Sequence, residues 1–188
     1  NPDSLKVVDP VMGDNGKPYS TYTPELIRRM KELVDAADVI TPNLTETCML
    51  LGEECPPVMS VAQARSWLAR LSDKPGIVVI KGVPLIDDDG QKLSNVGFDR
   101  ESGSFWRIDW DHIPVHYPGT GDIFTSVLTA SLLKGESLPI ALNRATTFTE
   151  IAVKTTYSYG TEPRLGVLFE DCLSWLMTNT VLCDYRKL

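Results

Sequence analysis

The sequence predicts an α/β fold, a doubly wound and mostly parallel sheet with helices on both faces. Three short apolar segments that contain β-branched residues, as buried strands do, lie at residues 5–8, 37–40 and 77–82. Each is followed by a polar turn, and segments with helical spacing of apolar residues separate them. Strands connected in this way run parallel, so their carboxyl ends should share one rim of the sheet, where ligands bind.

The composition is that of a chain able to fold around its own core. Its 188 residues, 43% of them hydrophobic, are interpreted as one domain, or most of one, covering residues 1–188. The net charge of −7 argues against a nucleic-acid-binding surface. No apolar run reaches the roughly 18 residues that span a bilayer. The four cysteines follow neither zinc-binding nor disulfide spacing, and a reducing cytoplasm is the default location.

The first strand ends at Asp9, where a loop rich in turn-forming residues begins. It carries two carboxylates, Asp9 and Asp14, beyond the end of a strand, which makes both candidates for holding Mg²⁺ directly or through water. Ordinary turn chemistry is the alternative for the segment 14–16. The chain opens directly on this core strand, so we expect that N-terminal sequence is missing.

A helix at residues 23–35 leads to the second strand, which also ends in a polar turn with proline. Within this turn, Asn43 and Glu46 have the spacing of a capping box for the next helix. In the alternative, Glu46 faces the same rim and orients water bound to a metal, while Asn43 contacts a phosphate or the hydration shell of the metal.

The segment 77–82 is the clearest buried strand, after a helix that Ser60 caps. Lys81 stands at its carboxyl end, a place that suits contact with a nucleotide phosphate, although a lysine there often extends to solvent. Residues 93–98 and 104–110 flank a turn and predict a β-hairpin.

A glycine turn directly before an apolar helix organises the second half of the chain. Gly119 and Gly121 flank Thr120, so the backbone N–H groups of this turn can point toward one anion at the positive end of the helix. The helix is expected to be largely buried and to end at Gly135. Asp122 at its start is either an N-cap or a general base that takes a proton from a hydroxyl attacking a bound phosphate.

The remaining segments are interpreted as scaffold. Helices are expected at residues 138–157 and 163–177, followed by a frayed, charged C-terminus. His112 and His116, just before the glycine turn, have no partner that the sequence identifies.

Four segments, in this order, resemble the pyridoxal kinases of the ribokinase-like superfamily. They are Asp-Pro-Val-Met-Gly-Asp at 9–14, Thr-Pro-Asn-Leu-Thr-Glu at 41–46, Val-Val-Ile-Lys-Gly at 78–82 and Gly-Thr-Gly-Asp at 119–122. The resemblance covers essentially the whole chain. It implies ATP- and Mg²⁺-dependent phosphorylation of the 5′-hydroxymethyl group of pyridoxal, pyridoxine or pyridoxamine, usually by a homodimer. Members of this family also have a substantial N-terminal portion before residue 9.

The resemblance also implies a role for each matching residue. Asp122 would deprotonate the substrate hydroxyl, and the amides of Gly119, Thr120 and Gly121 would stabilise charge on the transferred phosphoryl group. The residues that would bind the nucleotide and its metal are Asp9, Asp14, Thr41, Asn43, Glu46, Lys81 and Thr120, and those that would manage Mg²⁺ are Asp9, Asp14 and Glu46.

Two alternatives remain open. One is a hydroxymethylpyrimidine kinase, a family with a similar segment at 9–14 that typically has cysteine where Asp122 stands. The other is a nucleotide-binding fragment without turnover, produced by loss of the N-terminal portion.

Overall fold

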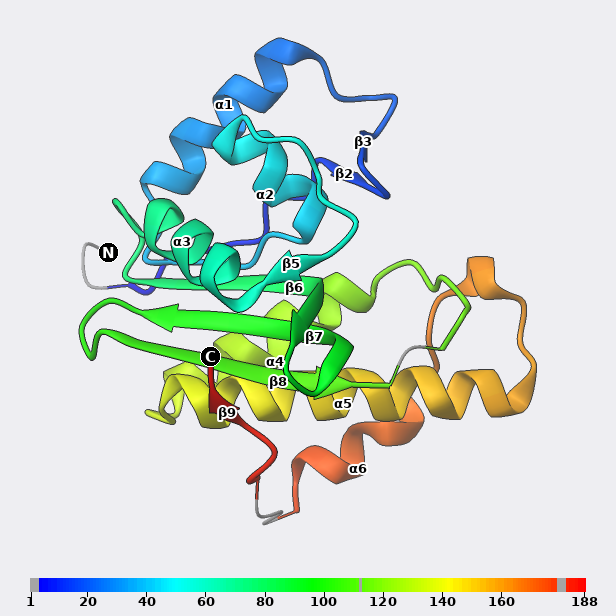
Figure 1. Cartoon of the computed structure of the whole chain (residues 1–188). Coiled ribbons are helices and arrows are strands. Elements are labelled where there is room, and N and C mark those ends of the chain that lie inside the picture. The colour runs from blue at the N-terminus through cyan, green and yellow to red at the C-terminus, as the bar shows by residue number, and fades with distance from the viewer. Residues whose placement is uncertain (1–3, 112, 179–181) are drawn as a thin grey trace.

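A mixed seven-stranded sheet forms the centre of the molecule (Figure 1). The computed structural model describes residues 4–111, 113–178 and 182–188. The sheet order is β1-β4-β6-β7-β8-β9, with β5 paired to the far end of β6. The pairs among β1, β4, β5 and β6 are parallel, whereas β6 to β9 pair antiparallel. The strands are β1 (Val7–Val8), β4 (Val39–Ile40), β5 (Met59–Ser60), β6 (Ile77–Asp87), β7 (Gly90–Asp99), β8 (Ser104–Trp110) and β9 (Arg186–Lys187).

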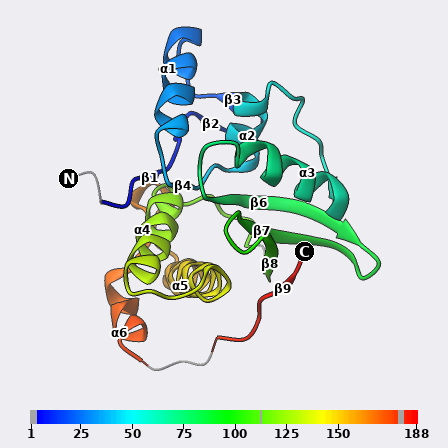
Figure 2. The same ribbon diagram turned by 90° about the vertical axis from the view of Figure 1, so that its left-hand side faces the viewer.

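Helices cover both faces of this sheet, which confirms the predicted fold class (Figure 2). One face carries α1 to α3, and the other carries α4 and α5. The helices are α1 (Pro24–Asp35), α2 (Leu44–Leu51), α3 (Val61–Leu71), α4 (Thr120–Leu133), α5 (Leu138–Tyr159) and α6 (Leu173–Leu176). No helix within the described residues is both long and apolar enough to cross a membrane.

The alternation of side chains along the central strands produces two separate cores. Val78 and Ile80 of β6 pack toward α2 and α3, whereas Val79 between them packs toward α4 and α5. Val39 and Ile40 of β4 divide in the same way. A continuous apolar run is therefore needed here because the strand is buried on both sides.

Strand β6 changes its pairing where the candidate site begins. Its backbone makes a bulge between Ile80 and Val83, and Gly82 has a φ of +65°. The Gly82 N–H donates to the side-chain oxygen of Asn95 at 2.9 Å. The predicted strand at 77–82 thus continues to Asp87 and forms a hairpin with β7, which the sequence analysis missed because the bulge interrupts the strand pattern.

The C-terminal region differs from the prediction in two ways. Residues 163–177 form two short 3₁₀ turns, η1 (Pro163–Leu165) and η2 (Glu170–Cys172), and the single-turn α6 rather than one helix. Gly166, with a φ of +80°, ends the first turn. The expected frayed end is also wrong, because β9 pairs with β8 and Leu188 is buried.

Candidate active site

One cavity of about 1040 Å³ lies at the carboxyl ends of β1 and β4 and at the bulge of β6, beside the N-terminus of α4. Residues from turns far apart in the sequence meet there, as the topology of the parallel strands predicts. The predicted site residues that line it are Asp9, Asp14, Asn43, Glu46, Lys81, Gly119, Thr120, Gly121 and Asp122. The remaining one, Thr41, is fully buried beneath it.

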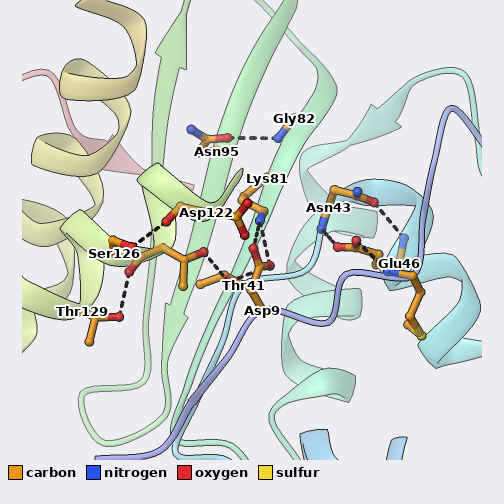
Figure 3. A network of polar contacts seen from close by, with 12 residues as sticks. Asp9, Thr41, Asn43, Glu46, Lys81, Gly82, Asn95, Asp122, Ser126 and Thr129 are labelled. Carbon is orange, nitrogen blue, oxygen red and sulfur yellow. Dashed lines mark hydrogen bonds and ion pairs between the residues drawn. The ribbon is translucent and has the colours of Figure 1, made fainter. Parts of the chain in front are cut away.

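The floor of the cavity carries an ion pair between Asp9 and Lys81. Lys81 Nζ lies 2.8 and 2.9 Å from the two carboxylate oxygens of Asp9, and only 14% and 12% of the two side chains are exposed. The Thr41 hydroxyl donates to Asp9 Oδ1 at 3.0 Å and lies 2.9 Å from Thr125 Oγ1 of α4 (Figure 3). Because a largely buried pair needs such additional hydrogen bonds, Thr41 orients Asp9 from below.

Glu46 lies on the opposite wall and closes the capping box of α2. Its Oε2 accepts the Asn43 N–H at 2.7 Å, while Asn43 Oδ1 accepts the Glu46 N–H at 2.8 Å (Figure 3). Its Oε1 accepts the Met12 N–H at 3.2 Å. Burial raises the pKa of Glu46 to about 7, against the opposing effects of the Asn43 hydrogen bond and the Lys81 charge. The predicted capping box is confirmed.

The start of α4 brings backbone amides close to the ion pair. Gly119 is the N-cap, with a φ of +89°, and no side chain of the described residues caps this helix. A Cβ atom on Gly121 would lie 3.1 Å from Lys81 Nζ and 3.6 Å from Asp9 Oδ2. The first N–H groups of the helix therefore reach the floor of the cavity without an intrahelical acceptor, which is the arrangement that binds phosphate.

Asp122 is the third residue of α4, and its side chain is exposed and extends toward Lys81 (Figure 3). The N-cap alternative for Asp122 is wrong, because Gly119 occupies that position. Asp122 also borders a second cavity of about 630 Å³, lined by apolar residues of α4 and of the segment 165–176. Asp122 thus lies between the two cavities.

A small ribbon of β2 (Gly13–Asp14) and β3 (Lys17–Pro18) borders the cavity, which Asp14 and the turn at 15–16 help to line. Burial raises the pKa of Tyr19, and so does the negative charge of Asp14 and other carboxylates of the site. Asp14 Oδ2 lies 3.7 Å from Nδ1 of His116. Sequence reasoning missed Tyr19, although an aromatic residue among turn formers was a usable signal, and it identified no partner for His116. His112 lies outside the described residues.

The far end of the cavity comes from elements to which the sequence analysis gave no functional role. Asn95 of β7, Trp110 of β8 and Thr149 of α5 line it. These three residues belong to no sequence motif. Only the packing of α5 against the β7–β8 hairpin brings them to this cavity.

The carboxylates of Asp9 and Glu46 are not arranged as a preformed metal-binding site. Both oxygens of Asp9 accept from Lys81, and both oxygens of Glu46 accept backbone amides. Within the described ranges, no group of three or more His, Cys, Asp and Glu residues is arranged to hold a metal. Asp14 differs, since its Oδ1 accepts only the Asn15 N–H at 2.8 Å. Of the three carboxylates, Asp14 is therefore the one that could hold a Mg²⁺ ion, directly or through water.

Known proteins with similar sequences include pyridoxal kinases and hydroxymethylpyrimidine/phosphomethylpyrimidine kinases. The chain is 32% identical to the pyridoxal kinase PdxY of Rubrobacter xylanophilus over 146 residues, which are 76% of this chain and 48% of that protein. It is 29% identical to the hydroxymethylpyrimidine/phosphomethylpyrimidine kinase of Haemophilus influenzae over 154 residues, which are 82% of this chain and 56% of that protein. The chain thus spans about half the length of these relatives.

Solved structures show the same fold. A protein of Bacteroides thetaiotaomicron, provisionally named a phosphomethylpyrimidine kinase and crystallised with pyridoxal, superposes with a TM-score of 0.92 at 41% identity. The match covers 100% of this chain and 66% of that one. Pyridoxal kinase from Lactobacillus plantarum superposes with a TM-score of 0.80 at 31% identity over 93% of this chain and 61% of that one.

The family profile described as phosphomethylpyrimidine kinase matches residues 3–165, a range that contains every predicted site residue. This match confirms the resemblance seen in the four sequence segments. The chain belongs to the phosphomethylpyrimidine kinase family, as a ribokinase-like protein of the pyridoxal kinase type.

Proposed function

We propose that this chain carries the ATP site and catalytic base of a kinase that phosphorylates the 5′-hydroxymethyl group of a B6 vitamer. One observation carries the proposal: the N-terminal amides of α4, the Lys81 ammonium and the Asp122 carboxylate meet in one cavity. The amides and the ammonium suit the phosphates of ATP, and the carboxylate suits the proton of an acceptor alcohol.

Each group has a distinct role in this proposal. Asp122 accepts the hydroxyl proton as the alcohol oxygen bonds to the γ-phosphorus and the bond to the β,γ-bridging oxygen breaks, which releases ADP. The amides of Gly119, Thr120 and Gly121 donate to the phosphoryl oxygens as charge builds on them. Lys81, held by Asp9, supplies a fixed positive charge beneath these oxygens.

The wall opposite α4 holds the remaining polar groups in place. Asn43 donates from Nδ2 to the Gly13 carbonyl at 2.9 Å and so ties the β2–β3 ribbon to α2. Glu46 keeps Asn43 and the Met12 backbone in position. Asp14 would hold Mg²⁺, directly or through water, and the ion would neutralise phosphate charge when it is bound.

The acceptor is proposed to be a B6 vitamer rather than a hydroxymethylpyrimidine. The 41% identical Bacteroides thetaiotaomicron protein contains pyridoxal. Asp122 also favours the pyridoxal kinase type, because hydroxymethylpyrimidine kinases typically have cysteine at this position. The hydroxymethylpyrimidine alternative is kept because of the similarity to the Haemophilus influenzae kinase.

A coupled assay of ADP release tests the proposal with ATP, Mg²⁺ and one acceptor at a time. Release that depends on pyridoxal, pyridoxine or pyridoxamine supports it, whereas release that depends only on hydroxymethylpyrimidine supports the alternative. Binding of a non-hydrolysable ATP analogue without any release identifies a nucleotide-binding fragment. Absence of nucleotide binding would refute the ATP site itself.

The assembly of the whole protein is proposed to be a homodimer, as the resemblance to pyridoxal kinases implies. Light scattering of the whole protein after size exclusion tests this, and the mass of a single polypeptide would contradict it.

A further inference from the structure

The bulge of β6 lies directly at the lysine of the proposed phosphate site. Two residues of β6, Lys81 and Gly82, lie between the paired positions on either side of the bulge, whereas only Asn95 lies between the corresponding positions of β7. Gly82 has a φ of +65°, which glycine adopts without strain. Such bulges change the direction in which a neighbouring side chain points. The backbone at Gly82 therefore influences where the Lys81 side chain lies.

The side chain of Asn95 takes the place of a backbone acceptor in the sheet. On the β4 side of β6, the Lys81 N–H donates to the Pro42 carbonyl at 2.8 Å. The next N–H, that of Gly82, points the other way, toward β7, and Asn95 Oδ1 accepts it at 2.9 Å (Figure 3). Asn95 thus restores the hydrogen bond that the bulge removes from the ladder.

Helix α5 fixes the orientation of this amide. Asn95 Nδ2 donates to Thr146 Oγ1 at 3.0 Å, and the Thr146 hydroxyl donates its own proton to the Leu142 carbonyl at 2.8 Å. Asn95 and Thr146 are both buried, at 6% and 4% exposure. Because the Gly82 N–H can only donate and Thr146 Oγ1 here accepts, each end of the amide has a single suitable partner. Helix α5 therefore holds Asn95, and Asn95 holds Gly82.

The Lys81 ammonium has little room to move. Its Nζ lies 2.8 and 2.9 Å from the two carboxylate oxygens of Asp9, and a Cβ atom on Gly121 would lie 3.1 Å from it. A small rotation of the backbone at Gly82 would move the base of the lysine side chain and so change this fit. Glycine has the widest backbone freedom of all residues, so the hydrogen bond from Asn95 is what restrains this rotation.

We propose that Asn95 is a positioning residue, whose amide fixes the backbone at Gly82 and thereby holds the Lys81 ammonium where the nucleotide phosphates bind. The inference rests on the proposed ATP site and adds a residue that acts through the lysine. Because Asn95 also lines the cavity, the test has to separate this role from a direct contact with the nucleoside.

The first test is Asn95→Leu, which keeps a similar size and removes both hydrogen bonds. Calorimetry should show about 3- to 10-fold weaker binding of a non-hydrolysable ATP analogue, the loss expected for one neutral hydrogen bond. Inorganic tripolyphosphate should lose affinity by the same factor, because it needs the same ammonium. A direct contact with the nucleoside would instead weaken binding of the ATP analogue alone.

A double-mutant cycle tests whether Asn95 acts through Lys81. Lys81→Met removes the ammonium and leaves the amides of α4 as phosphate donors, so binding stays measurable. In this background Asn95→Leu should cost no further affinity, because there is no ammonium left to position. A general disturbance of the cavity would lower affinity by the same factor in both backgrounds.

A second pair of variants leaves Asn95 itself in place. Thr146→Val keeps the shape of the side chain and removes the acceptor of Asn95 Nδ2, so it should weaken tripolyphosphate binding by about 2- to 5-fold. Thr146→Ser keeps the hydroxyl and should bind as the wild type does. The control is Thr147→Val, which removes a hydroxyl of α5 that bonds Asn143 Oδ1 at 3.4 Å, and it should not change affinity.

Unchanged affinity of Asn95→Leu would overturn the inference, as would a loss confined to the ATP analogue or an equal loss in the Lys81→Met background. If Asn95→Leu does not fold, the Thr146 pair decides, and equal affinities of Thr146→Val and Thr146→Ser would overturn it. If the wild type binds neither ligand, the ATP site is refuted instead, so the two failures are distinguishable.

Discussion

At the scale of single residues, the site separates groups that are free to react from groups that hold others in place. Asp122 is exposed in the cavity. In contrast, both carboxylate oxygens of Asp9 accept hydrogen bonds from Lys81, and both of Glu46 accept hydrogen bonds from backbone amides. A carboxylate without such partners can accept a proton from a substrate. We therefore propose base catalysis for Asp122 and a positioning role for the other two.

The first prediction concerns Asp122. Asp122→Asn should lower kcat by about 10²–10⁴-fold, because the amide cannot accept the hydroxyl proton, with little change in nucleotide affinity. Steady-state kinetics with a B6 vitamer, together with calorimetry of an ATP analogue, measures both. Full activity of Asp122→Asn would show that Asp122 is not the base.

The second prediction follows from the raised pKa of Glu46. The folded-state pKa is about 7 and the ordinary value is 4.5, so between these values the folded protein binds more protons than the unfolded chain. Stability should therefore fall as pH rises from about 4.5 to 7, by up to about 3 kcal/mol, and then level off.

Thermal melts of the Glu46→Gln protein at pH 5 and pH 8 check this prediction. The variant should lose the decrease in stability between these two values, while Glu54→Gln, at an exposed position beyond the same helix, should keep it. An unchanged pH dependence in Glu46→Gln would assign the effect to another group.

At the scale of elements, the N-terminus of α4 decides whether a phosphate fits. The helix begins without a side-chain cap among the described residues, and its first turn packs directly over the Asp9–Lys81 pair. The capping box of α2 works in the opposite way, since Asn43 and Glu46 already satisfy its first amides. Of these two helices, α4 is the one whose first amides no side chain of the described residues caps.

The third prediction tests this close approach. Gly121→Ala places a Cβ atom 3.1 Å from Lys81 Nζ, a contact so close that the ammonium must shift by a few tenths of an ångström. We expect nucleotide affinity to fall by about 10-fold, roughly the effect of one hydrogen bond to a charged group. Calorimetry with an ATP analogue measures it.

The control for this prediction is Gly76→Ala. Its Cβ atom would meet the Asp38 carbonyl oxygen at an ordinary 3.7 Å, away from the cavity. Affinity should stay at the wild-type value in this variant. If Gly121→Ala also binds normally, the amides of α4 do not hold the phosphates.

At the scale of the whole molecule, two cores hold the sheet between its helix layers. The core beneath α4 and α5 contains Leu142, which is fully buried, and it also fixes the helix whose N-terminus enters the cavity. Stability and site geometry are therefore linked through this layer.

The fourth prediction is that Leu142→Ala lowers the free energy of unfolding by about 2–5 kcal/mol, because it leaves a cavity in a packed core. Urea denaturation measures the change. Leu133→Ala, at a position of α4 that is 68% exposed, should have an effect within about 0.5 kcal/mol. Similar losses in the two variants would argue against this description of the core.

The sequence by itself determined the features that depend on neighbouring residues. The capping box of Asn43 and Glu46, the glycine turn before α4 and the buried strand at residues 77–80 each follow from backbone bonding or burial over a few residues. Because parallel strands end at one rim, these local features were enough to predict that the polar turns share a cavity.

Only the tertiary structure decided the contacts between distant residues. Asp9 and Lys81 are 72 positions apart, and neither their ion pair nor the Thr41 hydrogen bond to Asp9 could be read from the sequence. Likewise, the β9 pairing and the position of Thr149 in the cavity result from packing across the whole fold. Local patterns do not encode such contacts, because burial and partner choice are set by residues that the chain brings together only when it folds.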